Sequence, residues 1–202
     1  IMAFARKYEY FEVRHMLQAA EGVDSPVTQQ PAHSRVLHAM GGGGTGATLG
    51  NMLDRVTKRP GESGNKFKKR GAGATGAFTS QLQQGSAACE ALNSMVGQDA
   101  LAWFDDVEHQ GFGLRLVLTA PISRESGFLP ASGAPSAYAV KKGDAEVTRA
   151  ANTSGVKLII DRAANSNTMH IQTCYPLNGA APVAEWDVTD MSGRTVVAWS
   201  TD

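Results

Sequence analysis

The segment HIQTCYPLNG, residues 170–179, carries an imidazole, a hydroxyl, a thiol and a phenol within its first six residues. Its alternation of residue types predicts a short β-strand that ends near Pro176. Successive side chains of a strand point to opposite faces, which predicts one face with Ile171, Thr173 and Tyr175 and another with His170, Gln172 and Cys174. Thr and Tyr can donate hydrogen bonds to a ligand, but β-branched and aromatic residues also favour strands for structural reasons. Both interpretations stay open from this segment alone.

A second distinctive feature is a cluster of cations on a chain whose formal net charge is zero. Residues 1–71 hold 11 Lys and Arg against 6 Asp and Glu, whereas the rest of the chain holds 8 against 13. Residues 55–70 carry one acid, Glu62, and the bases Arg55, Lys58, Arg59, Lys66, Lys68, Lys69 and Arg70. This density suits either a solvated loop or a surface that binds nucleic-acid phosphates. The segment has no G-x-x-x-x-G-K-[ST] pattern, which excludes a P-loop nucleotide site.

Length and composition limit the remaining possibilities. The 202 residues suffice for one domain, with or without an extra arm. No apolar run approaches the roughly 20 residues of a membrane helix. The start IMAFARKYEY lacks the apolar stretch of a secretion signal and begins with Ile, so we expect a fragment of a longer protein. Cys89 and Cys174 are too few and too far apart for a zinc site or a disulfide framework, and we expect both to be half-buried.

The first half of the chain has helical periodicity. We expect a helix over residues 4–20, then a Pro-containing linker, then a short helix in AHSRVLHAM that contains His33 and His38 and ends at the glycine run 41–44. Thr45 is predicted to cap the next helix, which carries Arg55 and ends at Pro60.

The second half changes from helical periodicity to alternation. A Gly-rich basic loop is expected over residues 61–78, followed from Thr79 or Ser80 by Ala-rich helices that break at Gly97. A surface loop is expected over residues 123–137. Six later runs have strand character: GLRLVLTAP, SAYAVKK, GVKLIIDRA, NTMHIQTCYP, AEWDVTD and RTVVAWS. Helices followed by strands predict an α+β fold, with N-terminal helices packed against a mostly antiparallel, twisted β-sheet.

The order of these signals resembles the RNase A-like toxin domains at the C-terminal ends of bacterial contact-dependent inhibition proteins and related polymorphic toxins. The His pair HSRVLH comes first, MLDR follows, GAFTS leads into an Ala-rich helix, and ALAWF precedes a sheet that ends in IQTCYP. The resemblance covers about residues 32–177. It implies an RNase A-like domain over residues 32–202 with a C-terminal extension from about residue 178, preceded by an N-terminal helix and linker over residues 1–31.

Carried over residue by residue, the resemblance implies a metal-independent ribonuclease with no cofactor. His38 matches the second histidine of the family's H-x-x-x-x-H-like start, Arg55 the arginine of MLDR, and Thr173 and Tyr175 the closing T-x-Y-P. The glycine run lengthens the spacing between His38 and Arg55, so His33 stays an alternative to His38. The residues expected to bind RNA are Lys58, Arg59, Lys66, Lys68, Lys69 and Arg70.

The resemblance also implies roles in cleaving RNA to a 2′,3′-cyclic phosphate. Such cleavage needs a base for the 2′-hydroxyl, a cation for the phosphate and an acid for the leaving oxygen. Histidine suits proton transfer, and Arg55 can hold a phosphate through two parallel hydrogen bonds. Thr173 would donate to a non-bridging oxygen, and Tyr175 would donate, stack on a base or serve as the acid. His15, His109 and His170 are expected to be structural or surface residues.

The family context implies a domain of a larger secreted effector that acts on RNA in the target-cell cytoplasm and is neutralised in its producer by an immunity protein. Two other classes stay open. An ADP-ribosyltransferase toxin would use an early arginine, the segment Phe78–Ser80 and a later acid such as Glu185. A non-catalytic module would bind RNA through the basic loop without cleaving it.

Overall fold

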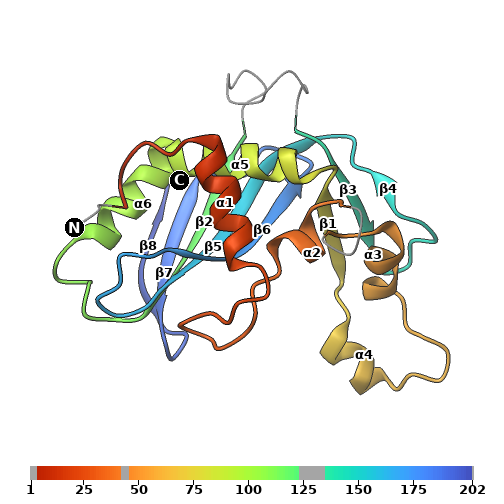
Figure 1. Ribbon diagram of the computed structural model, residues 1–202. Coiled ribbons are helices and arrows are strands. Elements are labelled where there is room, and N and C mark those ends of the chain that lie inside the picture. The colour runs from red at the N-terminus through yellow and green to blue at the C-terminus, as the bar shows by residue number, and fades with distance from the viewer. Residues whose placement is uncertain (1–3, 42–45, 123–134, 202) are drawn as a thin grey trace.

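The computed structural model describes residues 4–41, 46–122 and 135–201 (Figure 1). The helices of this part of the chain are α1 Tyr10–Ala20, α2 Ser34–His38, α3 Leu49–Val56, α4 Gly64–Arg70, α5 Gln81–Asn93 and α6 Met95–Asp105. The strands are β1 Ala74–Phe78, β2 Leu114–Pro121, β3 Ala137–Lys141, β4 Thr148–Arg149, β5 Thr153–Arg162, β6 His170–Asn178, β7 Glu185–Asp190 and β8 Thr195–Ser200. All strand pairs within the two sheets are antiparallel, so the predicted α+β class is confirmed.

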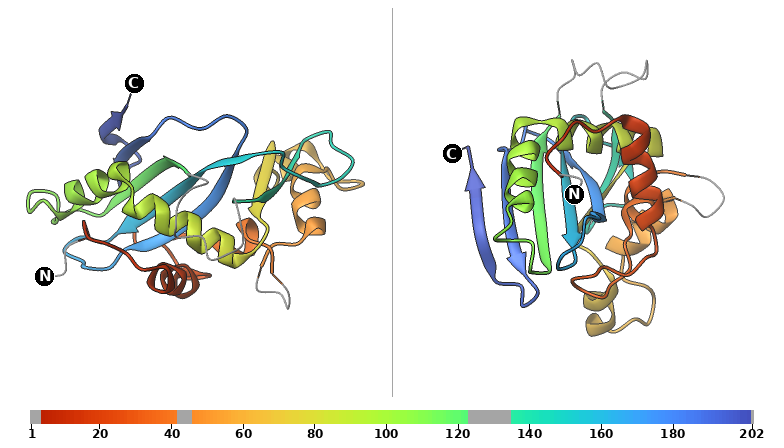
Figure 2. Two further views of the ribbon diagram at one scale, coloured as in Figure 1. Left: turned by 90° about the horizontal axis from the view of Figure 1, so that it is seen from above. Right: turned by 60° about the vertical axis from the view of Figure 1, so that its left-hand side comes forward.

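The larger sheet has five strands in the order β6-β5-β2-β7-β8. Helices α1, α5 and α6 lie on one side of it, as the view from above in Figure 2 shows. Apolar side chains from these helices and from four of the strands form the main core, in which Leu116, Leu158 and Ile160 are fully buried. The predicted C-terminal extension contributes β7 and β8 to this same sheet.

The smaller sheet has the order β1-β3-β4 and packs against α3. Met52 and Val56 of α3 meet Ala77 of β1 and Val140 of β3 in a separate apolar cluster. The smaller sheet and α3 form the smaller lobe of the molecule. Helix α4 projects from the end of this lobe, at the lower edge of Figure 1. The two lobes meet where β1 approaches β6: a Cβ on Gly76 would lie only 3.3 Å from Pro176 Cγ. A glycine therefore permits the close approach of the two sheets.

Two predicted helix starts are wrong, and capping explains the difference. The first helix begins at Tyr10 instead of residue 4, because the Asp105 carboxylate accepts the backbone N–H groups of Phe4 and Ala5, at 2.6 and 2.7 Å, and holds this segment outside a helix. Helix α3 begins at Leu49, and Thr48 caps it by accepting from Asn51 N. Thr45, the predicted cap, lies outside the described residues, as do Gly42–Gly44.

The predicted helix break at Gly97 is also wrong. The two Ala-rich helices part at Ser94, whose hydroxyl accepts from Gly97 N and so caps α6. Gly97 therefore lies in the first turn of α6. A serine cap determines this boundary, and glycine only accompanies it.

The predicted Gly-rich loop over residues 61–78 contains regular structure. Ser63 accepts from Lys66 N and starts α4, and β1 occupies residues 74–78 in full register with β3. Cross-strand pairing outweighs the low strand propensity of ATGAF. Most of the predicted loop 123–137 lies outside the described residues.

Leu158 of β5 belongs to the main core and is fully buried. We expect Leu158→Ala to lower the free energy of unfolding by about 3 kcal/mol, because the lost methyl groups leave a cavity. The control is Val196→Ala on β8, where the side chain is 51 % exposed and the expected change is under about 0.5 kcal/mol. Urea denaturation followed by circular dichroism measures both. Equally small losses would contradict the placement of Leu158.

Candidate active site

A cavity of about 650 Å³ lies between the two sheets, and all four predicted catalytic residues line it together with His33. β6 contributes Thr173 and Tyr175, α2 and its N-cap position contribute His38 and His33, and α3 contributes Arg55. In Figure 1, α2 lies between β6 and β1. The structure thus brings the residues of three distant segments to one place.

A β-bulge in β6 sets which side chains reach the cavity. Ile160 pairs with Ile171 and Ile159 with Thr173, so Gln172 is an extra residue without a cross-strand partner. Consequently Ile171 and Cys174 both enter the main core, while Thr173 and Tyr175 line the cavity. The predicted placement of Ile171 on the Thr173 face is wrong, because the bulge interrupts the alternation. The strand also continues past Pro176 to Asn178, since β6 is an edge strand that tolerates proline.

Cys174 and Cys89 are both buried and free. They are more deeply buried than the sequence predicts, because both side chains belong to the main core.

His38 is the buried imidazole of the cavity, with 8 % of its surface exposed. Its Nδ1 lies 2.8 Å from the carbonyl oxygen of Gly76. A carbonyl only accepts, so Nδ1 carries the hydrogen and Nε2 keeps its lone pair. Burial lowers the pKa of His38 to about 4, helped by the charges of Arg55 and His33 and opposed by the Gly76 carbonyl. The ring is therefore neutral at pH 7 and can accept a proton at Nε2.

His33 occupies the N-cap position of α2, with its ring centre 5.8 Å from that of His38. It is half-exposed, and its backbone N–H donates to the carbonyl oxygen of Gln172 at 3.2 Å. The sequence left His33 and His38 as alternatives, and both line the same cavity. They differ in setting, since His38 is buried and hydrogen-bonded while His33 lies nearer the solvent.

Arg55 supplies the cation. Its Nη1 donates to Thr75 Oγ1 at 3.0 Å, and no carboxylate of the described residues lies within ion-pair distance. Burial lowers the pKa of Arg55, although a guanidinium keeps its charge in any protein. A half-buried cation that has no ion-pair partner in the described part of the chain can attract an anionic ligand, and it offers further N–H groups to bind one.

The wall formed by β6 supplies two hydroxyl groups. Thr173 is 4 % exposed, and its Oγ1 has no hydrogen-bond partner among the described residues. A buried hydroxyl without a partner costs stability, so a ligand oxygen that meets it would be stabilised. Burial raises the pKa of Tyr175, which keeps the phenol protonated at neutral pH. The Tyr175 ring centre lies 5.3 Å from that of His38.

The opposite wall of the cavity was not predicted from the sequence. Lys141, Asp144 and Thr148 line it from the β3–β4 hairpin, and Asn178 lines the cavity from the end of β6. Asp144 is engaged by the backbone, because its Oδ2 accepts from Lys141 N at 2.9 Å. These residues lie in no recognisable motif. The lysine pair that ends SAYAVKK is the only signal that would have suggested an anion-binding wall.

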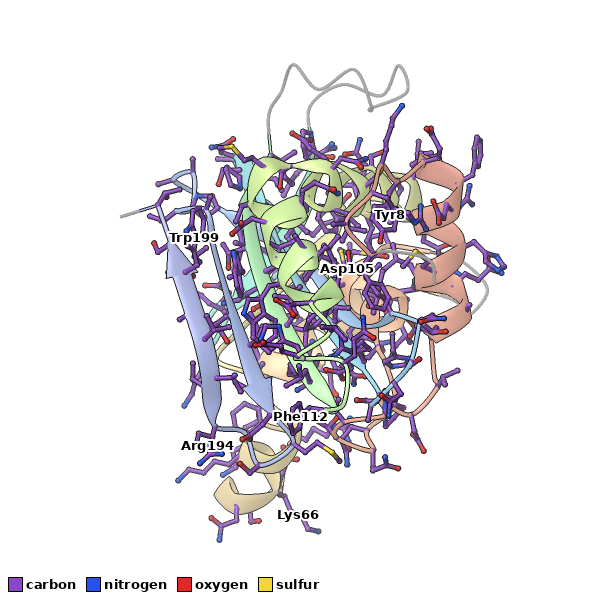
Figure 3. The ribbon with its side chains drawn as sticks, turned by 90° about the vertical axis from the view of Figure 1, so that its left-hand side faces the viewer. Tyr8, Lys66, Asp105, Phe112, Arg194 and Trp199 are labelled. Atoms are coloured by element: carbon purple, nitrogen blue, oxygen red, sulfur yellow. The ribbon has the colours of Figure 1, made fainter. Side chains whose placement is uncertain are left out.

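Four of the predicted RNA-binding residues can be placed in the structure, and none of these four lines the cavity. Lys58, Arg59, Lys66 and Lys68 are exposed on the α3–α4 segment, and Arg59 forms an ion pair with Asp54. Figure 3 shows Lys66 on α4, at the lower end of the molecule. The side chains of Lys69 and Arg70 lie outside the described part of the chain.

The residues named for an ADP-ribosyltransferase lie apart from the cavity. Phe78 is fully buried, and Ser80 caps α5 by accepting from Gln83 N. Glu185 is exposed at the start of β7 and does not line the cavity.

The three histidines expected to be structural or surface residues also lie outside the cavity. His109 stacks on Trp103 at 3.6 Å between ring centres, and Nε2 of His170 lies 3.0 Å from Gln172 Oε1. His15 is exposed on α1.

No protein-family model matches this chain, and no curated protein or solved structure matches it significantly. Within the described residues, no helix has both the length and the apolar character needed to span a membrane. The same part of the chain has no group of three or more His, Cys, Asp or Glu side chains placed to hold a metal ion.

The buried state of His38 predicts a specific acid sensitivity. Its folded-state pKa is about 4, below the value of about 6.5 for an unfolded chain. The unfolded state therefore binds the proton first, and stability falls as the pH drops from about 6.5 towards 4. Between pH 7 and 4.5 we expect this group to remove about 2–3 kcal/mol of the free energy of unfolding.

Urea denaturation at both pH values measures this loss. The loss should shrink in His38→Gln and persist in the control His15→Gln, since His15 is exposed. An NMR titration that gave His38 an ordinary pKa would contradict the buried setting.

Proposed function

We propose that this chain is a metal-independent ribonuclease domain of the RNase A-like toxin type, which cleaves RNA to a 2′,3′-cyclic phosphate. The observation that carries the proposal is the convergence in one cavity of a neutral imidazole, a guanidinium, a buried hydroxyl and a protonated phenol. Among the described residues, the guanidinium of Arg55 has no ion-pair partner and the hydroxyl of Thr173 has no hydrogen-bond partner. These are the groups that a phosphodiester needs for attack by its own 2′-hydroxyl.

In the proposed reaction, His38 Nε2 takes the proton of the 2′-hydroxyl, and the 2′-oxygen forms a bond to phosphorus. Arg55 and Thr173 bind the non-bridging oxygens, where negative charge grows in the transition state. The bond from phosphorus to the 5′-oxygen breaks, and the leaving oxygen takes a proton from Tyr175. His33 is the alternative acid, because its ring also reaches the cavity.

Cations beside the cavity support a nucleic-acid substrate. Lys66 and Lys68 of α4 and Lys141 and Lys142 of the β3–β4 segment belong to the same lobe, and Lys142 Nζ lies 6.0 Å from the Phe67 ring centre. Such a surface can contact phosphates beyond the scissile one.

The same type of domain implies the biological setting that we propose. The domain would be part of a larger secreted effector used in interbacterial competition, act in the target-cell cytoplasm and be neutralised in its producer by an immunity protein. The lysines of α4 and of the β3–β4 segment, here called the cationic lobe, would suit an acidic face on that partner.

The catalytic proposal is tested with purified protein and a labelled single-stranded RNA in the presence of EDTA. We expect cleavage to persist, with a 2′,3′-cyclic phosphate as product. His38→Ala should lower kcat by about 100-fold or more, because it removes the base. Thr173→Val, Arg55→Gln and Tyr175→Phe should each lower kcat by about tenfold or more. His15→Ala is the control.

Loss of cleavage in EDTA would indicate a metal nuclease instead. Retention of RNA on a filter without any shortening would indicate a binding module. Transfer of label from NAD would indicate an ADP-ribosyltransferase.

The cationic lobe gives a separate expectation for binding. Lys66→Gln and Lys68→Gln together should weaken RNA binding and reduce the dependence of log K on log salt by about 0.7 for each lost phosphate contact on a single strand. Lys7→Gln is the control, because Lys7 is exposed on the N-terminal segment, which packs beside α5 and α6, away from the cavity. Fluorescence anisotropy over a salt series measures the effect, and an unchanged slope in the double variant would exclude these lysines from the interface.

A further inference from the structure

Four of the predicted site side chains that line the cavity come from two elements, α2 and β6, which must be held at fixed relative positions. His33 and His38 come from α2, a helix of five residues, while Thr173 and Tyr175 come from β6. No ladder of strand hydrogen bonds joins these two elements. A proton-transferring ring must nevertheless lie within a few tenths of an ångström of its productive position.

Gln172, the extra residue of the β6 bulge, bridges the two elements. Its Nε2 donates to the carbonyl oxygens of Gln30 and Pro31, at 3.2 and 3.1 Å, and its backbone carbonyl accepts from His33 N at 3.2 Å. One residue thus holds the three positions that lead into α2. The side chain is almost fully buried, at 4 % exposure, so water does not replace these bonds.

The orientation of the Gln172 amide is fixed from its other end. Because Nε2 donates to two carbonyls, Oε1 faces His170, whose Nε2 lies 3.0 Å away and acts as the donor. Since the bulge leaves Gln172 without a cross-strand partner, its backbone carbonyl is available to His33.

A second glutamine makes a parallel connection from α5. Gln84 Nε2 donates to the carbonyl oxygen of Ser34 at 2.7 Å and to that of Cys174 at 2.9 Å. Ser34 follows His33 in the chain, and Cys174 lies between Thr173 and Tyr175. These two hydrogen bonds, made from α5, also hold the start of α2 against β6.

We propose that Gln172 is a positioning residue of the candidate active site, which sets His33 and His38 against Thr173 and Tyr175, with Gln84 as its second tie. The inference rests on the proposed ribonuclease function for its kinetic effect. The geometric part, the placement of the imidazoles by Gln172, stands on the hydrogen bonds alone.

The test compares Gln172→Met with Gln98→Met. Methionine keeps the length and volume of glutamine and removes the donors. Gln98 is the matched control, because its Nε2 also donates to two backbone carbonyls, those of Arg6 and Leu92, both at 2.8 Å, and its residue does not line the cavity. Urea denaturation places both variants on one stability scale, and kcat and KM are measured on the same RNA over a range of pH.

We expect Gln172→Met to lower kcat by about 10- to 100-fold with KM changed less than about threefold, because misplaced catalytic groups lose transition-state contacts. Gln98→Met should keep the wild-type kcat. Gln172→Asn, which retains the amide on a shorter side chain, should recover part of the loss. An unchanged kcat in Gln172→Met, or an equal fall in the control, overturns the positioning role.

A second measurement separates this inference from the proposed function. The imidazole C–H signals of His33 and His38 should shift in NMR spectra of Gln172→Met and stay in place in Gln98→Met, whether or not the protein cleaves RNA. An inactive wild-type protein with these shifts would reject the ribonuclease and retain the positioning. Unchanged imidazole signals would reject the positioning even in an active enzyme.

Discussion

The bulge at Gln172 is the constraint on which both the core and the cavity depend. Without the extra residue, strict alternation would turn either Ile171 or the Thr173–Tyr175 pair away from its place. The bulge allows Ile171 and Cys174 to enter the core while Thr173 and Tyr175 face the cavity. It also leaves a backbone carbonyl for His33 N. A local irregularity in one strand therefore allows both faces of β6 to pack and anchors α2 at the same time.

The short helix α2 depends on tertiary contacts, because five residues cannot form a stable helix by themselves. Its N-cap residue, His33, makes no side-chain cap. The Glu21 carboxylate replaces that cap by accepting the backbone N–H groups of Arg35 and Val36 at 2.7 and 3.2 Å. Gln84 holds the other face of the first turn. The candidate catalytic histidines thus belong to a segment whose order is imposed by its surroundings, which keeps their rings fixed at little cost to folding.

The sequence predicted the class of fold because amphipathic helices and alternating strands have distinct periods. The order of short motifs also named His33, His38, Arg55, Thr173 and Tyr175, which line one cavity, but it missed the lining residues from the β3–β4 hairpin. The predicted helix boundaries were wrong where the carboxylate of Asp105, distant in the sequence, or a serine cap at Ser94 determines them. Strand β1 was not predicted, because its stability comes from pairing with β3, about sixty residues away in the chain. Gln172 and Gln84 gave no signal, since glutamine in a strand or helix resembles a solvent-facing residue and only the folded chain shows its partners.

The electrostatics of the cavity would link the binding of a phosphate to the strength of His38 as a base. In the free protein, burial together with the positive charges of Arg55 and His33 keeps the pKa of His38 at about 4, which makes it a weak base. A phosphodiester bound between Arg55 and Thr173 would bring a negative charge next to the ring and offset the effect of the guanidinium. In the proposed reaction that charge would raise the pKa of His38 and strengthen its Nε2 as a proton acceptor. In the proposed ribonuclease, a phosphate in the cavity would therefore strengthen His38 as a base, and the buried hydroxyl of Thr173 would gain a hydrogen-bond partner in the same step.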